Sequence, residues 1–429
     1  MKKFFLLSFI LLISLGADNL QLIKKGDPDS NTTLLVIGGI HGNEPGGYFA
    51  ASLLATHYEI TSKSLWIVPN LNQESIIRNQ RGINGDMNRK FATIRANDPD
   101  KKIVDAVKKL ILNPKVSLIL NLHDGHGFYR KKHQGSIFNP NAWGQTCVID
   151  QCQLPRHKTF GNLNDIAISV KNSINKRLLA KHHQFDVKNT KTKFEDEAMQ
   201  LSLTYYAVTH DKPAFAIETS KNLSSLTQKV FYQLLAIEEY MKIMGINYKR
   251  DFEFNRKEIA KILKNRGTLA INNNFLLDLQ NIKKTLSFVP LKSKSNDFNF
   301  SHYLGKVKKS KGVYEVFIGN KFITKLKPQY FEVSSDIPKN FLVEADGKQL
   351  SVKKASKFFV SDDFKVLSLK GYRVNIIGFS PKKKGDESNL NVRKSDMNRY
   401  YSIDKNNNIY RIEFYKENKF CAMLLVQFR

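Results

Sequence analysis

The sequence predicts an α/β domain, with a mixed sheet flanked by helices, followed by two small and mainly antiparallel β modules. Up to about residue 250, apolar runs of strand length alternate with amphipathic stretches of helix length, which is typical of α/β folds. Beyond that point the runs are short, alternate in polarity and are separated by Asn, Gly and Lys turns. A chain of 429 residues also exceeds one ordinary hydrophobic core.

The first residues have the pattern of an export signal. Lys2 and Lys3 precede an apolar run over residues 4–15, and the small pair Gly16 and Ala17 follows as a cleavage site. The run is shorter than the roughly 20 residues of a spanning helix, so we expect cleavage and no stable membrane insertion. The mature protein is therefore expected in the periplasm.

The catalytic part of the chain is expected over residues 18–250. Its predicted buried strands are residues 33–40, 64–68, 116–122 and 214–217. Its predicted helices are residues 44–57, 98–112, 164–181 and 223–243.

The last part of the chain is expected to hold a β-rich middle module over residues 251–338 and a β-sandwich-like module over residues 339–429. Residues 313–318 read as a strand, and residues 409–415 and 420–428 read as a terminal hairpin. The break between the modules is placed near Pro338. The lysine run at residues 382–384 is interpreted as a solvated loop.

The net charge of the chain indicates which classes of binding partner to expect. The net charge is +29, spread over the whole length, and such a surface attracts polyanions. An exported chain meets little nucleic acid but abundant cell-wall polymer with free carboxylates, so we expect no nucleic-acid partner. The alternative is that the many lysines reflect only an AT-biased genome.

Three cysteines are too few for a disulfide-stapled scaffold. Cys147 and Cys152 are close enough in sequence to pair in an oxidising compartment, and buried thiols are the equal alternative. There is no Cys-x-x-Cys motif, which argues against a thiolate zinc site.

A short motif with metal-ligand spacing follows the first apolar strand. His41 and Glu44 form an HxxE pattern, and His123 comes directly after the run at 116–122. Catalytic zinc takes three His or carboxylate ligands and leaves a fourth position for water. A lone HxxE motif is by default a surface His–Glu pair. Here, however, the HxxE motif and His123 each follow a predicted strand. Because ligands gather at the carboxyl ends of strands in α/β sheets, one site could hold His41, Asn70, His123 and Glu218.

The segment over residues 78–91 is too polar and too rich in Gly and Asn to be core. We interpret it as a substrate-reading loop, in which Asn88 and Arg89 hold a terminal carboxylate and another arginine faces the carbonyl oxygen under attack. The alternative is a surface loop whose arginines pair with Asp86.

Together, the HGNE motif, the segment from Arg81 to Arg89, His123 and Glu218 resemble the zinc carboxypeptidases over roughly residues 33–222. The resemblance implies one bound zinc ion and a fold with a mixed sheet. It implies these roles: zinc ligands His41, Glu44 and His123; general base Glu218; carbonyl polarisation by Arg81, with Arg78 the less favoured candidate; and carboxylate binding by Asn88 and Arg89.

Within that class, the export signal, the two β modules and the stretches 121–127 and 143–147 look like the cell-shape peptidoglycan carboxypeptidases of helical bacteria. This resemblance implies a D,L-carboxypeptidase that trims tripeptide stems to dipeptides and releases meso-diaminopimelate. Some members place Gln at the first ligand position, where this chain has His41. The wider class also has a substrate-covering tyrosine, for which Tyr205 and Tyr206 are both candidates.

Other polar residues leave alternatives open. His126 is interpreted either as a substrate contact or as a group that orients Asp124 or the metal ligands. His182 and His183 are expected at a solvated helix end. The acidic run at 195–197 is expected to be a solvated loop, with contact to the diaminopimelate ammonium as the alternative.

Two other functions remain open at this point. Residues 38–44 and 86–89 also resemble the aspartoacylase and succinylglutamate desuccinylase enzymes, but an export signal argues against that intracellular group. A non-catalytic wall-binding scaffold is the third hypothesis, against which the complete ligand set argues.

Overall fold

The computed structural model describes residues 11–14, 20–334, 337–381 and 385–429. Contacts between residues divide the chain into two units, Met1–Lys264 and Asn265–Arg429, which are described separately. Most of the predicted export signal lies outside the described residues, as do residues 335–336 and 382–384. The strand Leu11–Ser14 is described, and it pairs antiparallel with the next strand.

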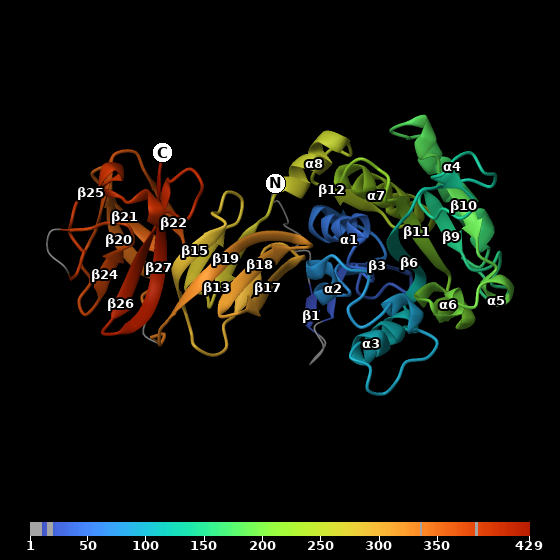
Figure 1. The fold of residues 1–429 in the computed structure, drawn as a ribbon, viewed down its shortest axis with the longest axis horizontal. Coiled ribbons are helices and arrows are strands. Elements are labelled where there is room, and N and C mark those ends of the chain that lie inside the picture. Colours follow the sequence, from blue (N-terminus) through green and yellow to red (C-terminus); the bar gives the residue numbers. More distant parts are fainter. Residues whose placement is uncertain (1–10, 15–19, 335–336, 382–384) are drawn as a thin grey trace, which may run out of the picture. The chain divides into compact units, whose positions relative to one another are not determined.

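The first unit is built on a mixed eight-stranded sheet (Figure 1). In spatial order its strands are β1 (Leu11–Ser14), β2 (Gln21–Gly26), β5 (Ser64–Val68), β3 (Thr33–Gly38), β6 (Val116–Gly125), β11 (Ala214–Ser220), β9 (Thr146–Ile149) and β10 (Asp186–Asn189). The four central strands β5, β3, β6 and β11 run parallel. Every residue of β3 and β5 is buried, as expected for strands covered on both faces.

Helices cover the two faces of this sheet (Figure 1). The helices are α1 (Pro45–His57), α2 (Gln73–Arg78), α3 (Lys101–Ile111), α4 (Leu163–Asn175), α5 (Thr192–Glu195), α6 (Leu203–Thr209), α7 (Leu226–Ile243) and α8 (Arg256–Lys264). Helices α1, α4 and α7 pack on one side, and α3 and α6 pack on the other. Small two-stranded sheets join β4 (Tyr58–Ile60) to β12 (Tyr248–Arg250) and β7 (Phe128–Tyr129) to β8 (Phe138–Asn139).

The predicted strands and helices of this unit are present with shifted ends. The strand predicted over 64–68 has those bounds, whereas β6 and β11 continue three residues further than predicted. They continue because they pair with each other in register, with Glu218 opposite His123. Helix α7 begins at Leu226 rather than at residue 223, since the Ser225 side chain accepts the Gln228 N–H and caps it there.

The second unit consists mainly of β-sheets, with short 3-10 helices at Lys394–Asp396 and Arg399–Tyr401. Its first half holds β13 (Thr268–Ile271), β14 (Phe275–Asp278), β15 (Thr285–Leu291), β16 (Phe298–Phe300), β17 (Gly305–Ser310), β18 (Val313–Ile318) and β19 (Lys321–Tyr330). Its second half holds β20 (Asn340–Ala345), β21 (Lys348–Lys353), β22 (Lys357–Val360), β23 (Asp363–Val366), β24 (Arg373–Ile376), β25 (Val392–Arg393), β26 (Ile409–Lys416) and β27 (Lys419–Phe428). The β15–β19 and β22–β27 pairs are parallel, and the other pairs in this unit are antiparallel.

The last two four-stranded sheets share one hydrophobic core. Phe341 packs on Phe414 with ring centroids 3.9 Å apart, and Phe364 packs on Phe428. The predicted terminal hairpin is present as β26 and β27. The mixed sheet with flanking helices and the mainly antiparallel second part confirm the predicted fold class. The three-part domain division stays a prediction; the contact boundary follows α8, which sequence reasoning did not predict.

Among the described residues, no helix combines the length and the apolar character needed to cross a membrane.

Candidate active site

Three metal-ligand side chains meet at the end of the central strands. His41 lies in the turn after β3, Glu44 directly precedes α1, and His123 lies on β6. The turn is tight, because a Cβ atom on Gly42 would come within 2.0 Å of the Ser75 backbone. Glycine is therefore required between the two ligands of the HxxE motif.

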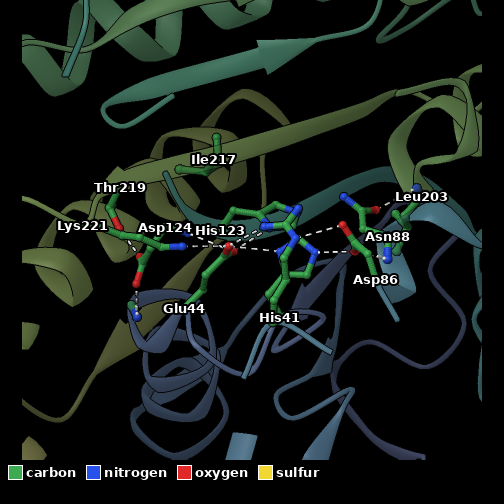
Figure 2. Close-up of polar contacts among 12 residues, drawn as sticks. His41, Glu44, Asp86, Asn88, His123, Asp124, Leu203, Ile217, Thr219 and Lys221 are labelled. Atoms are coloured by element: carbon green, nitrogen blue, oxygen red, sulfur yellow. Dashed lines mark hydrogen bonds and ion pairs between the residues drawn. The ribbon is translucent and has the colours of Figure 1, made fainter. Parts of the chain in front are cut away.

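The donor atoms of these side chains converge (Figure 2). The Glu44 carboxylate lies 3.1 Å from His41 Nδ1 and 2.9 Å from His123 Nδ1. One ligand atom from each residue can be chosen within 4.8 Å of the other two, and all three side chains are at most 5 % exposed. His41 Nδ1 is buried without a hydrogen-bond partner among the described residues.

This geometry suits zinc. Donors at about 2.0–2.2 Å around a tetrahedral ion lie roughly 3–4 Å apart, and the Glu44 oxygens lie 2.9 and 3.1 Å from the two histidine nitrogens, within a group whose donors span at most 4.8 Å. Burial lowers the pKa of His123, which favours the neutral imidazole that binds metal. Burial opposes ionisation of Glu44, but the charges and hydrogen bonds of the two histidines outweigh it and hold its pKa well below the usual range. The group is therefore suited to bind one zinc ion.

Asp86 supports the first ligand from outside. Its Oδ1 lies 2.8 Å from His41 Nε2, and its Oδ2 accepts from Arg81 Nε at 2.9 Å. A carboxylate on the outer nitrogen fixes the ring and its tautomer, so that Nδ1 faces the metal position. Sequence reasoning considered Asp86 only as a partner for loop arginines; its place in the DMNR run is the one signal that could have identified it.

Glu218 lies beside the ligands on the neighbouring strand. In the backbone pairing of β11 with β6, Glu218 lies opposite His123. The Oε2 atom of Glu218 is buried without a hydrogen-bond partner among the described residues. Burial raises the pKa of Glu218 well above its ordinary value, and the charges of Glu44 and Asp124 raise it further. A carboxylate in this state binds a proton readily.

These residues line one cavity of about 230 Å³. The cavity is lined by all eight residues that were predicted as metal ligands, catalytic groups or substrate contacts: His41, Glu44, Arg81, Asn88, Arg89, His123, His126 and Glu218. Asn88 Oδ1 accepts the Leu203 N–H at 3.0 Å, so its amide nitrogen remains to donate to a ligand. The His126 residue is exposed.

Five further cavity residues of interest were not predicted as site residues: Trp143, Val148, Met199, Thr204 and Lys221. Lys221 Nζ lies 3.4 Å from Glu44 Oε1. Arg81 Nη1 lies 3.3 Å from the same oxygen. The cavity therefore carries at least three cations, counting Arg89, around its carboxylates.

Several predicted neighbours lie elsewhere. Asn70 is absent from the cavity lining among the described residues and donates to Gln21 Oε1, so its predicted membership of the site is wrong. Neither Tyr205 nor Tyr206 lines the cavity; Tyr206 packs on Phe91 and on the Lys108 ammonium.

Two other polar segments lie as follows. Glu195 is exposed and pairs with Lys191 at 2.7 Å. His182 is exposed, but His183 is buried, bonded to Tyr232 OH and stacked on Phe128. The prediction of a solvated end is therefore wrong for His183.

The cysteines are free thiols. Cys147 is buried, and burial raises its pKa to about 12. Cys152 is exposed and accepts a hydrogen bond from Asn189.

The fold and site define a metallohydrolase with one His–Glu–His metal centre and an adjacent carboxylate. Comparison with known proteins narrows that class. The family described as the catalytic part of a carboxypeptidase controlling helical cell shape matches residues 1–264, and the C-terminal domain of metallo-carboxypeptidase matches residues 334–429. Comparison with curated protein sequences gave no match.

Solved structures agree. The apo and tripeptide-bound structures of the cell shape determinant protein Csd4 from Helicobacter pylori are each 35 % identical to the chain, with a TM-score of 0.90, and cover 96 % of this chain and 100 % of theirs. The meso-diaminopimelate-bound form, described as a D,L-carboxypeptidase, has the same identity and TM-score over 95 % of this chain and 100 % of its own.

The chain belongs to the family of carboxypeptidases that control helical cell shape. It is a zinc metallocarboxypeptidase with the predicted fold.

Proposed function

We propose that the protein is a periplasmic zinc D,L-carboxypeptidase that trims peptidoglycan tripeptide stems to dipeptides and thereby influences cell shape. One observation carries the proposal. A single cavity gathers the ligand group His41, Glu44 and His123, the buried carboxylate of Glu218 and the carboxylate-binding pair formed by Asn88 and Arg89. The matching family and the tripeptide-bound Csd4 structure support the same substrate class.

Substrate binding follows from the cations of the cavity. The terminal diaminopimelate residue of a tripeptide stem carries a free carboxylate next to the scissile bond, and the Arg89 guanidinium and the Asn88 amide nitrogen hold this carboxylate. Arg89 is fixed for this task because its Nη1 donates to the Asn88 carbonyl at 3.0 Å. His126 lies at the exposed side of the cavity and contacts the rest of the stem.

Zinc at the three ligands would act as a Lewis acid and make water nucleophilic near neutral pH. Glu218 takes a proton from the attacking water and passes it to the leaving amine. Its raised pKa suits both transfers. Arg81 donates to the carbonyl oxygen, on which negative charge develops only as the tetrahedral intermediate forms.

The test is a panel of purified muropeptides with di-, tri-, tetra- and pentapeptide stems, incubated with the mature protein and read by mass spectrometry. We expect loss of one diaminopimelate residue from the tripeptide stem alone. The matched control is Glu218→Gln, which should give no product. Release of D-alanine from longer stems, or hydrolysis only of small acylated amino acids, would contradict the proposed bond specificity.

A further inference from the structure

A second charged cavity lies within the second unit. It measures about 350 Å³ and lies among β15, β19, β26 and the segment 400–403. Its charged and aromatic lining residues are Lys283, Lys327, Arg411, Tyr400 and Tyr401. Among the described residues that line it there is no aspartate or glutamate.

The walls of this cavity are held in place by long-range hydrogen bonds. Lys283 Nζ donates to the Arg399 carbonyl at 2.7 Å, and the Lys283 N–H donates to the Ile403 carbonyl at 2.9 Å. The Lys405 N–H donates to the Asn281 carbonyl at 2.9 Å. Residues more than 110 positions apart are therefore fixed side by side, and Lys283 is anchored rather than free to swing.

The edge of the cavity carries a strained bulge. The pairing of β15 with β19 shifts between Leu286 and Val289, and Phe288 has a φ of 56°. A bulky residue rarely adopts that conformation without support. Arg411, only 3 % exposed, provides it by donating to the Ser287 and Phe288 carbonyls at 3.1 and 2.9 Å. Bulges often re-aim side chains beside binding sites.

Polar and aromatic groups remain available at this site. Arg411 Nε is buried without a hydrogen-bond partner among the described residues, although Arg411 Nη1 lies 3.5 Å from Glu413. Lys327 is exposed and has no ion-pair partner within the described part of the chain. Tyr400 is 68 % exposed, and its ring meets Tyr401 edge-on at 5.1 Å.

This combination selects a ligand chemistry. Arg411 is paired with Glu413, but Lys283 and Lys327 add positive charge to a lining that holds no acidic residue among the described residues, and such a lining attracts a negatively charged group. An exposed tyrosine offers a flat apolar face and a hydroxyl group, which suits the C–H face and hydroxyls of a sugar ring. We propose that this cavity is a binding site for a carboxylate-bearing glycan strand of the cell wall, separate from the catalytic cavity. The choice of wall glycan rests on the proposed function.

The carboxylate can come from two sources: the lactyl group of the muramic sugar itself, or the dipeptide stem that the catalytic reaction leaves. The experiment measures binding of the full mature chain carrying Glu218→Gln, which prevents turnover. The probes are soluble glycan strands stripped of peptides by an amidase, the same strands bearing dipeptide stems, and neutral chitin oligomers. Tighter binding of one anionic probe identifies the source of the carboxylate.

We expect Lys327→Glu and Tyr400→Ala each to weaken binding of the anionic strands by about fivefold or more, while Tyr400→Phe keeps the ring and retains binding. The matched charge control is Lys348→Glu, an exposed β21 lysine outside the cavity, which should change binding less than twofold. Equal loss in the two lysine variants, or equal binding of chitin oligomers, would overturn the proposal.

Hydrolysis of a soluble tripeptide muropeptide is measured in parallel with Lys327→Glu in the otherwise unmodified chain. Unchanged hydrolysis with weakened strand binding supports a separate glycan site. Loss of hydrolysis in that variant would contradict the separation. Absence of hydrolysis in the unmodified chain would instead refute the proposed function, so the two failures are distinguishable.

Discussion

The two units bury charged side chains for different purposes. In the first unit, His41, Glu44 and His123 point their donor atoms at one another, and Nδ1 of His41 is buried with no hydrogen-bond partner in the described part of the chain. In the second unit, the Arg411 guanidinium donates to two backbone carbonyls and lies 3.5 Å from the buried Glu413 carboxylate. Metal-type donor atoms that converge prepare a place for an ion, whereas a buried cation that is paired with carbonyls and a carboxylate stabilises the chain.

That difference separates the expected effects of mutation. Changes at the first cluster should alter metal binding or turnover with a small effect on folding. Changes at the second should alter stability and leave hydrolysis of small substrates intact. The following variants test the separation, beginning with the largest expected effect.

Glu218→Gln should lower kcat by about 10²–10⁴-fold, because the proton acceptor is lost, while the protein still binds zinc. The measurement combines kcat on a tripeptide muropeptide with metal content.

Glu238→Gln is the matched control, since Glu238 is also buried but its carboxylate accepts a hydrogen bond from Tyr58 OH outside the cavity. His123→Ala should lose both zinc and turnover. A Glu218→Gln variant as active as the parent would refute the role of this carboxylate.

Arg411→Met should destabilise the second unit by about 3–5 kcal/mol, because Glu413 then stays buried without its cation and two carbonyls lose their donors. Urea unfolding measures the change. Arg393→Met is the control, because that side chain is 68 % exposed and 3.9 Å from Asp363. An Arg411→Met protein of parental stability would mean that the bulge needs no such support.

Asp150 is a buried carboxyl group of a third kind: it is neutralised by a proton rather than by a metal ion or a cation. Burial raises its pKa to about 6, although a hydrogen bond from Thr192 opposes the rise. Since the unfolded pKa is about 3.9, the unfolded state loses its proton first, and this residue's contribution to stability falls as pH rises from about 4 to 6.

Asp150→Asn should therefore raise the free energy of unfolding at pH 7.5 by about 3 kcal/mol and change it little at pH 4. Denaturant titrations of parent and variant at the two pH values measure this difference. The same gain at both pH values would show that ionisation of Asp150 is not the cause.

Asp86→Asn should weaken zinc binding by about 10–100-fold, because the ring of His41 loses the carboxylate that orients it. Competition with a chromophoric chelator gives the affinity. Asp251→Asn is a matched control: Asp251 also contacts a histidine, His57, at 2.9 Å, but outside the cavity. Equal affinities for all three proteins would contradict a supporting role for Asp86.

Contacts between residues close in sequence could be predicted from the sequence, whereas contacts between distant segments could not. The HxxE motif was identifiable because His41 and Glu44 are held by local geometry around one turn, and His123 follows an apolar run. Asp86 was not identifiable as a metal-site residue, because its contact with His41 depends on how a loop 45 residues away folds back. His183 was predicted as solvated, since its burial requires Phe128 and Tyr232 from distant segments.

The ends of strands show the same limit. Apolar runs located β3, β5, β6 and β11, but the pairing of β6 with β11 extends both strands through His123 and Glu218. A polar residue at a strand end reads as a loop when only local polarity is considered. The register between two strands, which places Glu218 beside the metal ligands, is a tertiary property.

Metal reconstitution tests the central claim most directly. The mature protein is stripped with a chelator, titrated with zinc, and assayed on a tripeptide muropeptide at each step, with bound metal measured on the same samples. The account predicts that stripped protein is inactive and that activity returns in proportion to zinc, reaching its maximum at one ion per chain. Full activity in metal-free protein would contradict it, as would tight binding of one zinc ion by His123→Ala.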